Sequence, residues 1–218
     1  MRYINNKELI TKDFYQKFKE LLDFLFASIC LIIFIPIYLV IALLIKFSSR
    51  GPIFYTQRRL GKNNTLFNCI KFRTMHPEAE SMLISLIEND KKLKNEFYKD
   101  YKIKNDPRIT FIGKFLRKTS LDELPQFINV LKGEMSIVGP RPIITEEIPK
   151  YGENFLQVFS VKPGITGLWQ ISGRNNLSYE RRVALDKIYS EEISFVLDLR
   201  IILRTIGVIL FPKDKGAF

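Results

Sequence analysis

The feature that most constrains this chain is an uncharged, apolar stretch of 22 residues, FLFASICLIIFIPIYLVIALLI, which runs from Phe24 to Ile45. A straight helix of that length reaches about 30 Å, roughly the thickness of one hydrocarbon core. A signal peptide is disfavoured because the stretch starts late and no small-residue cleavage site follows it. We therefore expect a membrane segment in residues 1–48, followed by a catalytic domain in residues 49–218.

Pro36 interrupts the apolar stretch near its middle. Its ring removes one intrahelical hydrogen bond and crowds the carbonyl of Ile32, which predicts a kink with an arm of about half a bilayer on each side. Residues 1–23 hold five basic and four acidic side chains, and residues 46–77 hold seven basic and none acidic. Basic flanks favour the cytoplasmic side. The residues therefore support two alternatives equally: a re-entrant helix that enters and leaves one leaflet, and an ordinary spanning helix.

The charge balance is strongly basic, with 34 Lys and Arg against 23 Asp and Glu and a net charge of +11. Such a surface attracts nucleic acid, an anionic membrane or phosphorylated small molecules. We expect no nucleic-acid partner, because the chain carries a membrane segment and none of the known nucleic-acid-binding motifs. A single histidine, His76, argues against His-based metal sites and a Ser-His-Asp triad.

The part that follows the membrane segment predicts a β-hairpin and then helices. Two β-rich runs flank the turn signal at residues 61–64, and Lys71 and Arg73 are two apart in the second run, so they are expected to share a face. Residues 77–104 carry apolar side chains at helical spacing, which indicates one or two amphipathic helices. Residues 193–210 combine an apolar face with a basic stripe, typical of an interfacial helix or a core helix.

The sequence TSLDELPQFINVLKG places two adjacent carboxylates, Asp122 and Glu123, just ahead of Pro125. Proline is tolerated in the first turn of a helix, so a helix is expected to begin near 120–122 and to end at Gly133. Both carboxylates would then lie at a helix N-terminus.

Two interpretations of these acids compete. Ser120 and Glu123 have the spacing of a capping box, and acids at a helix start are favoured by the helix dipole. Alternatively, a carboxylate can attack phosphorus to form an acyl phosphate, if cations offset the repulsion between the two anions. Arg141, which is fixed between two prolines, suits bidentate phosphate contact. Hard oxygen ligands without histidine favour Mg²⁺, which Asp122 and Glu123 would hold.

Four ordered motifs, KFRTM, NDPRIT, RKTSLDELPQFINVLKGEMSIVGPRP and KPGITGLWQISGR, make the chain similar to the bacterial sugar transferase family of monotopic phosphoglycosyl transferases over nearly its whole length. The resemblance implies transfer of a sugar-1-phosphate from a UDP-sugar to undecaprenyl phosphate, with release of UMP, at the start of surface polysaccharide or glycan assembly. It implies Asp122 as nucleophile in a covalent phosphosugar intermediate, Glu123 as partner acid, and Mg²⁺ as cofactor. It also implies Arg141 as a nucleotide or phosphate contact and a re-entrant helix turning at Pro36.

The expectation is thus an α+β fold, mostly α with a small β-hairpin, in a monotopic protein with a re-entrant membrane helix and interfacial amphipathic helices. Expected partners are a UDP-hexose, undecaprenyl phosphate and membrane lipids at the cytoplasmic face of the bacterial inner membrane, and a homo-oligomer stays open. Competing readings are a basic, non-enzymatic membrane adaptor and a transferase without a covalent intermediate. Further phosphate-contact candidates, each of which could instead be a surface charge or a structural ion pair, are Lys71, Arg73, Arg108, Arg117 and Arg174.

Overall fold

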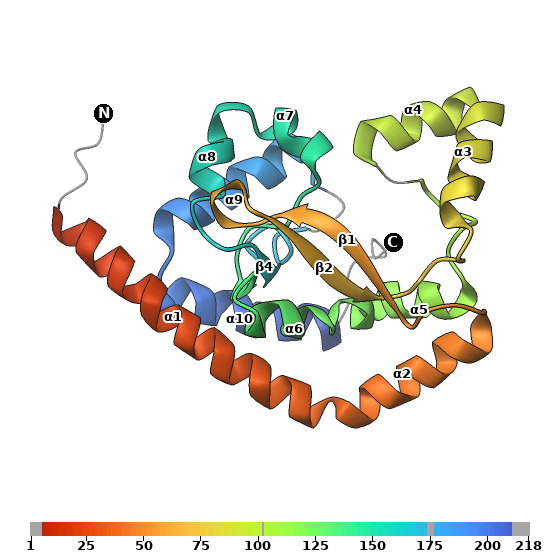
Figure 1. Cartoon of the computed structure of the whole chain (residues 1–218). Helices are drawn as coiled ribbons and strands as arrows, with labels where there is room; N and C mark the ends of the chain where they lie inside the picture. Colours follow the sequence, from red (N-terminus) through yellow and green to blue (C-terminus); the bar gives the residue numbers. More distant parts are fainter. Residues whose placement is uncertain (1–5, 102, 174–176, 211–218) are drawn as a thin grey trace. The chain divides into compact units, whose positions relative to one another are not determined.

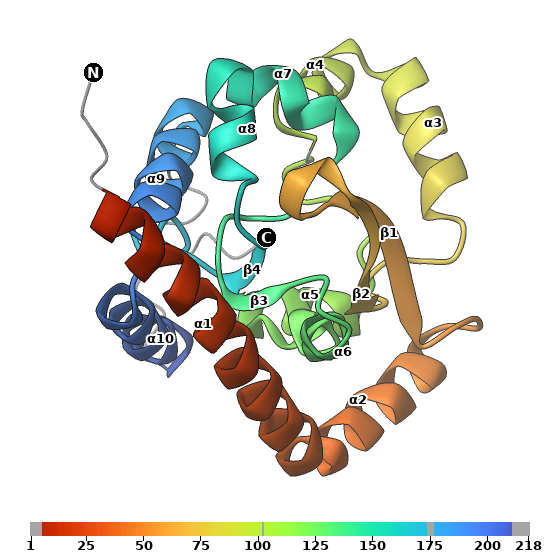
Figure 2. The same ribbon diagram turned by 60° about the vertical axis from the view of Figure 1, so that its left-hand side comes forward.

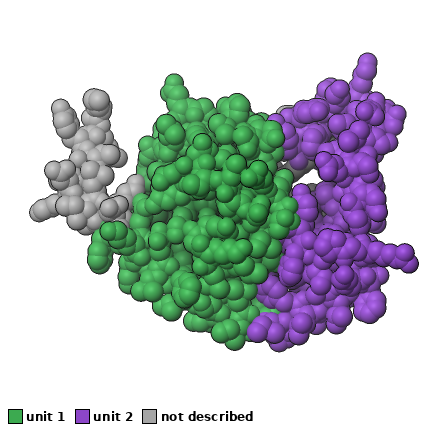
Figure 3. All heavy atoms as spheres, viewed as in Figure 1, with its two compact units in different colours: residues 1–34, 56–70, 125–216 green, residues 35–55, 71–124, 217–218 purple. Residues whose placement is uncertain are grey.

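A computed structural model describes residues 6–101, 103–173 and 177–210. The chain forms two compact units (Figure 3). Unit 1 takes its described residues from 1–34, 56–70 and 125–216, and unit 2 from 35–55 and 71–124. The boundary between membrane segment and catalytic domain expected at residue 48 stays a prediction.

The apolar stretch is split between two helices (Figure 1), α1 (Asn6–Ile33) and α2 (Ile35–Ser48). The N–H of Phe34 still donates to the carbonyl of Cys30 at 2.9 Å, but Pro36 has no N–H to continue the series. The predicted break is confirmed, and it lies at Phe34, just ahead of the proline. Within the described residues, no single helix has both the length and the apolarity of a membrane span. The pair formed by residues 14–33 and 35–48, bent by 61°, meets that test jointly.

The predicted β-hairpin is confirmed. Strand β1 (Phe54–Leu60) pairs with β2 (Leu66–Phe72), and a 3-10 turn connects them. In that turn Asn63 and Asn64 have φ angles of 53° and 63°. Asparagine tolerates this left-handed region better than most residues, which explains why the Gly-Lys-Asn-Asn sequence makes the turn.

Unit 2 is helical apart from the ends of the two strands. The two amphipathic helices predicted in residues 77–104 are confirmed as α3 (Ala79–Asn89) and α4 (Lys91–Asp100), and α5 (Phe111–Thr119) follows. The core of this unit forms where α2, β2 and α5 bury apolar side chains together, and its buried members are Ile41, Ile45, Phe72 and Leu116.

Unit 1 builds its helices around a short parallel sheet, in which β3 (Ser136–Val138) pairs with β4 (Gly164–Thr166). The helices α7 (Ile148–Tyr151), α8 (Phe155–Val158) and α9 (Tyr179–Glu192) lie together (Figure 2). They contribute side chains to one buried apolar cluster. The remaining helices of the unit besides α1 are α6 (Gln126–Leu131) and α10 (Phe195–Leu210). The described chain is therefore mostly helical with a small amount of sheet, as the expected α+β class requires.

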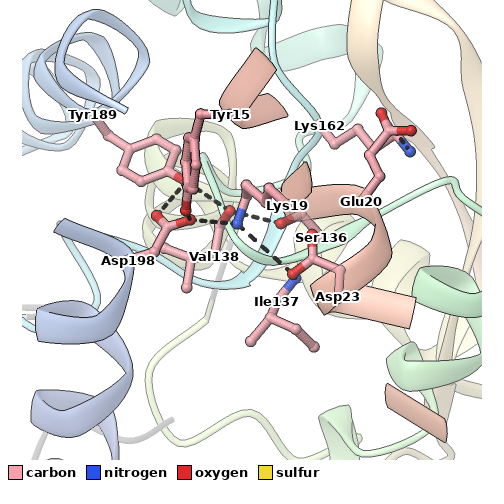
Figure 4. Close-up of polar contacts among 10 residues, drawn as sticks. All are labelled: Tyr15, Lys19, Glu20, Asp23, Ser136, Ile137, Val138, Lys162, Tyr189 and Asp198. Carbon is pink, nitrogen blue, oxygen red and sulfur yellow. Dashed lines mark hydrogen bonds and ion pairs between the residues drawn. The ribbon is translucent and has the colours of Figure 1, made fainter. Parts of the chain in front are cut away.

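A buried polar network joins α1 to α10 inside unit 1 (Figure 4). The carboxylate of Asp198 accepts hydrogen bonds from Tyr15 at 2.7 Å, from Lys19 at 2.6 Å and from Tyr189 at 2.8 Å. Lys19 also lies 3.7 Å from the carboxylate of Asp23. The ammonium group of Lys19 therefore compensates two buried acids, which fixes this side of α1 against α10.

Helix α10 has features of both alternatives expected for residues 193–210, a core helix and an interfacial helix. Asp198 and Ile201 are buried against unit 1, as in a core helix. Leu199, Leu203 and Ile206 are exposed, so the apolar face expected for an interfacial helix is left uncovered by the described chain. The basic stripe and the apolar face thus belong to a helix that is anchored on one side only.

Replacing Lys19 with Met removes the cation that Asp198 and Asp23 share. Because two buried carboxylates then lack a counter-charge, we expect the free energy of unfolding to fall by about 3 kcal/mol. The measurement is chemical unfolding in detergent micelles followed by circular dichroism. The control is Lys17→Met on the exposed side of α1, which should cost under about 0.5 kcal/mol. Equal effects of the two substitutions would contradict a stabilising role of the network.

Candidate active site

The two adjacent carboxylates lie in a turn between two helices, not in the first turn of a long helix. Helix α5 ends at Ser120, whose φ of 58° is left-handed, and residues 121–123 form a separate 3-10 turn. The next helix, α6, begins only at Gln126, with Pro125 as its N-cap. The predicted helix start at 120–122 is therefore wrong, because the left-handed Ser120 and the missing N–H of Pro125 divide the segment.

The capping-box interpretation is also wrong. The side chain of Ser120 makes no cap hydrogen bond, and its backbone instead closes the C-terminal end of α5. The backbone N–H of Glu123 donates to the carbonyl of Ser120 at 3.3 Å, which belongs to the 3-10 turn itself. A capping box thus does not account for the two acids, which lie in the first turn of this short 3-10 helix.

Asp122 and Glu123 occupy different environments although they are neighbours in the chain. Asp122 retains 8% of its surface exposed, whereas the side chain of Glu123 is 27% exposed. Lys71, at the end of β2, donates from its Nζ to Glu123 Oε1 at 2.5 Å. One acid is therefore buried and the other is half-exposed and ion-paired.

The electrostatic surroundings of Asp122 are mixed. Burial raises the pKa of its carboxyl, Lys71 lowers it, the like charge of Glu123 raises it and Arg117 lowers it, with a result of about 6. The carboxylate is therefore ionised at neutral pH, yet it is more basic than an ordinary aspartate. A carboxylate that is charged, buried and close to cations is suited to attack an electrophile that carries negative charge.

Two of the predicted cations, Lys71 and Arg117, belong to unit 2, as do Asp122 and Glu123, which we call the dyad. Lys71 contacts Glu123, and both Lys71 and Arg117 favour the ionised form of Asp122. The Nε of Arg117 also donates to Thr74 Oγ1 at 3.0 Å, which holds the guanidinium in place. Strand β2 and helix α5 thus each supply one cation to the turn that carries the acids.

Two other predicted cations make structural contacts. Arg73 donates to the carbonyls of Arg50 and Ser49 at 2.9 and 2.8 Å, which ties down the chain after α2. Arg108 forms a buried pair with Asp106, with 2.6 Å between Nη2 and Oδ2. Although Lys71 and Arg73 are two apart, they thus have different partners, because β2 ends at Phe72. Phosphate contact by Arg73 and Arg108 stays a prediction.

The last two predicted cations belong to the sequence of unit 1. The guanidinium carbon of Arg141 lies 5.8 Å from the ring centroid of Trp169, and that of Arg182 lies 5.3 Å from the same ring. Arg174 falls outside the described residues. Neither Trp169 nor Arg182 was assigned a role from sequence, because a tryptophan in a loop and an arginine on a mixed-charge helix are ordinary there.

The dyad fits one type of Mg²⁺ site. In the described parts of the chain, no group of three or more His, Cys, Asp or Glu side chains could hold a metal. Mg²⁺ is nevertheless often bound by one or two carboxylates together with water and substrate phosphates. Asp122 and Glu123 offer that smaller set of ligands, so the residues suit a metal that arrives with a phosphorylated substrate.

Comparison with known proteins identifies relatives of the chain. Residues 14–212 match the family model described as "Bacterial sugar transferase". An uncharacterized sugar transferase of Haemophilus influenzae is 47% identical over 200 residues, covering 92% of this chain and 42% of its own length. The exopolysaccharide production protein ExoY of Rhizobium meliloti is 44% identical over 197 residues, covering 90% of this chain and 87% of its own length.

A third relative is named for its activity. The undecaprenyl-phosphate galactose phosphotransferase of Salmonella typhimurium is 46% identical over 168 residues, covering 77% of this chain and 35% of its own length. The chain thus spans less than half of the Haemophilus and Salmonella relatives and most of ExoY.

Replacing Lys71 with Met should raise the pKa of the Asp122 carboxyl above its value of about 6. The reason is that the cation that lowers this pKa most is lost, while burial and the charge of Glu123 remain. The titration can be followed by carbon NMR of protein labelled at aspartate side chains. Lys118→Met, on the exposed side of α5, is the matched control and should leave the titration in place. An unchanged or lower pKa in the Lys71 variant would contradict the proposed electrostatics.

Proposed function

Because the chain belongs to the bacterial sugar transferase family, we propose that it transfers a sugar-1-phosphate from a UDP-sugar to undecaprenyl phosphate and releases UMP. The observation that carries the proposal is the buried carboxylate of Asp122 next to Lys71, Arg117 and Glu123. The names of the relatives support the substrate class: one is an undecaprenyl-phosphate galactose phosphotransferase, and another is an exopolysaccharide production protein. The galactose in the first name favours a hexose, and the resemblance stated for the sequence favours UDP as its carrier.

The proposed chemistry has two steps at one phosphorus atom. A carboxylate oxygen of Asp122 bonds to the phosphorus that carries the sugar, the bond from that phosphorus to the bridging diphosphate oxygen breaks, and UMP leaves with the electron pair. A phosphate oxygen of the lipid then attacks the same phosphorus, and the bond to Asp122 breaks. The products are the lipid diphosphate sugar and a regenerated carboxylate.

The neighbouring side chains have separate roles in this proposal. Lys71 and Arg117 reduce the repulsion between the Asp122 carboxylate and an anionic donor. Glu123, which is half-exposed, can accept a proton from a protonated lipid phosphate or help to bind a metal. Mg²⁺ held by Asp122 and Glu123 would supply further neutralisation of phosphate charge. Arg141 is proposed to contact the donor's phosphates or nucleotide.

We also propose that α1 and α2 form a re-entrant element at the cytoplasmic face of the membrane. Large apolar side chains along both helices are exposed, among them Ile29, Ile32, Leu39 and Leu43. Exposed apolar surface of this extent marks a contact with lipid or protein. A lipid phosphate lies at the membrane surface, so an enzyme that enters one leaflet reaches it without extracting the lipid tail.

Asp122→Asn should reduce UMP release from a UDP-hexose by at least about 10³-fold, because the amide cannot replace the carboxylate nucleophile. UMP is measured with undecaprenyl phosphate and Mg²⁺, using a panel of UDP-sugars. The matched control is Asp90→Asn, since Asp90 only caps α4 in the same unit, and it should retain activity. If Asp122→Asn remains active, or if the unmodified protein releases no UMP from any donor, the proposed function is wrong.

A further inference from the structure

Helix α5 of unit 2 exposes two aromatic side chains that lie one helical turn apart. Phe111 is 86% exposed and Phe115 is 51% exposed. Residues at positions i and i+4 are neighbours on one face of a helix, so the two rings belong to a single exposed face. The side of the helix that carries Gly113 and Leu116 is buried. Helix α5 therefore combines a packed face with an aromatic face that the described chain leaves uncovered.

Basic side chains border the aromatic pair. Lys114 and Lys118 are both exposed, and each lies three residues after one of the two phenylalanines. The helix sequence, FIGKFLRKT, contains no acidic residue. An exposed helix face with apolar rings and lysines is complementary to an anionic membrane surface. The rings can enter the acyl boundary there, while the ammonium groups stay among the lipid phosphates.

Within unit 2, α5 packs against α2, the second arm of the proposed membrane element. The two helices bury Ile45 and Leu116 in one apolar cluster. On its other side α2 exposes Leu43 and, near its C-terminal end, Phe47, which is 86% exposed. Large apolar side chains are thus exposed on two helices that contact each other. A leaflet that receives α2 therefore lies next to α5 as well.

The turn that carries the dyad is attached to both of these helices. It follows α5 directly, because α5 ends at Thr119 and the turn begins at Leu121. Leu121 and Leu124 pack against the cluster that α2 and α5 share. The hydroxyl of Tyr38, on α2, donates to the carbonyl of Leu124 at 2.5 Å. The depth of α2 and α5 in a membrane therefore sets the depth of the dyad.

We propose that α5 is a second membrane-contacting element, whose partner is an anionic phospholipid bilayer. Phe111 and Phe115 enter the boundary between headgroups and acyl chains, and Lys114 and Lys118 bind the headgroup phosphates. The inference rests on the proposed function, because it takes α2 to lie in the leaflet from which the lipid substrate is drawn. Its consequence is that α5 holds the dyad at the level of the lipid phosphates.

The test is quenching of tryptophan fluorescence by brominated lipid, with the full chain in nanodiscs of phosphatidylglycerol and phosphatidylcholine in equal amounts. Only one of the two lipids is brominated in each experiment, so the membrane charge stays constant. The probe is Phe115→Trp, and Phe111→Trp is a second position. Both sites are exposed, so unit 2 can accept the larger ring. The unmodified protein, whose single Trp169 is buried, gives the background.

Brominated lipid should quench the new tryptophan at either position well above the background. The lipids around position 115 should favour phosphatidylglycerol about fivefold, because one lysine near an anionic surface shifts a binding equilibrium by about that factor. Adding Lys114→Gln and Lys118→Gln to the Phe115→Trp protein should reduce this preference to about one, while quenching by both lipids remains.

Two further variants in unit 2 serve as controls. Leu43→Trp, on the exposed side of α2, should be quenched strongly if α2 lies in the membrane. Tyr98→Trp is the matched negative control, because Tyr98 is also an exposed aromatic residue. It lies on α4, at the other end of unit 2 from α2 (Figures 1 and 2). Neither brominated lipid should quench it.

The proposal is overturned if positions 111 and 115 show only the background while Leu43→Trp is quenched, because α5 would then face water or a protein. Equal quenching of position 115 by the two lipids with both lysines present would also overturn it. Absence of quenching at positions 43, 111 and 115 alike would overturn the re-entrant element together with it. Failure of the proposed transferase activity has a different signature: quenching at position 115 persists, but no UDP-sugar yields UMP.

Discussion

The compensated burial of one carboxylate, that of Asp122, is the interaction on which this account depends. An isolated carboxylate that loses its water becomes neutral, and a neutral carboxyl is a poor nucleophile. Lys71 and Arg117 prevent that outcome, while the neighbouring charge of Glu123 opposes them. The balance leaves Asp122 ionised at neutral pH but more basic than a solvated aspartate. Strand β2, helix α5 and the 3-10 turn at residues 121–123 are the elements that set this balance.

Unit 1 follows the same principle with different partners. Asp198 and Asp23 share Lys19, and Asp186 accepts a hydrogen bond from Tyr151. In each case a buried acid lies where an element must be held in one orientation: α1 against α10, or α7 against α9. Apolar packing is tolerant of small rotations, whereas hydrogen bonds to a buried carboxylate are directional. These acids are therefore understood as orienting contacts within an otherwise apolar core.

The sequence predicted features whose causes are local. Pro36 predicted the helix break, because a proline removes one hydrogen bond from any helix interior. Asn63 and Asn64 predicted the hairpin turn. Prediction from sequence failed where the outcome depends on a backbone conformation or a distant contact that the local pattern does not show. The start of α6 was misplaced by several residues, since nothing in the local pattern shows that Ser120 adopts a left-handed conformation. Likewise, Arg73 and Arg108 look like any other cations until their carbonyl and carboxylate partners are known.

The buried Asp186 shows a signal that sequence reasoning could have used. An acid on the side of α9 that also carries Val183 and Tyr179 is unexpected for a helix that packs on a core. Such a residue is either an error in the helical pattern or a buried polar group with a partner elsewhere. Only the structure identifies Tyr151 as that partner, because it lies 35 residues away in the sequence.

The central claim is that Asp122 bonds to phosphorus, and mass spectrometry of the protein and of its peptides tests it most directly. The protein is incubated with a UDP-hexose and Mg²⁺ in the absence of lipid phosphate, quenched in acid and then digested. The account predicts a mass increase equal to one hexose phosphate, carried by the peptide that contains Asp122 and removed when undecaprenyl phosphate is added before the quench. An active preparation that shows no adduct, or an adduct on a peptide without Asp122, would contradict it.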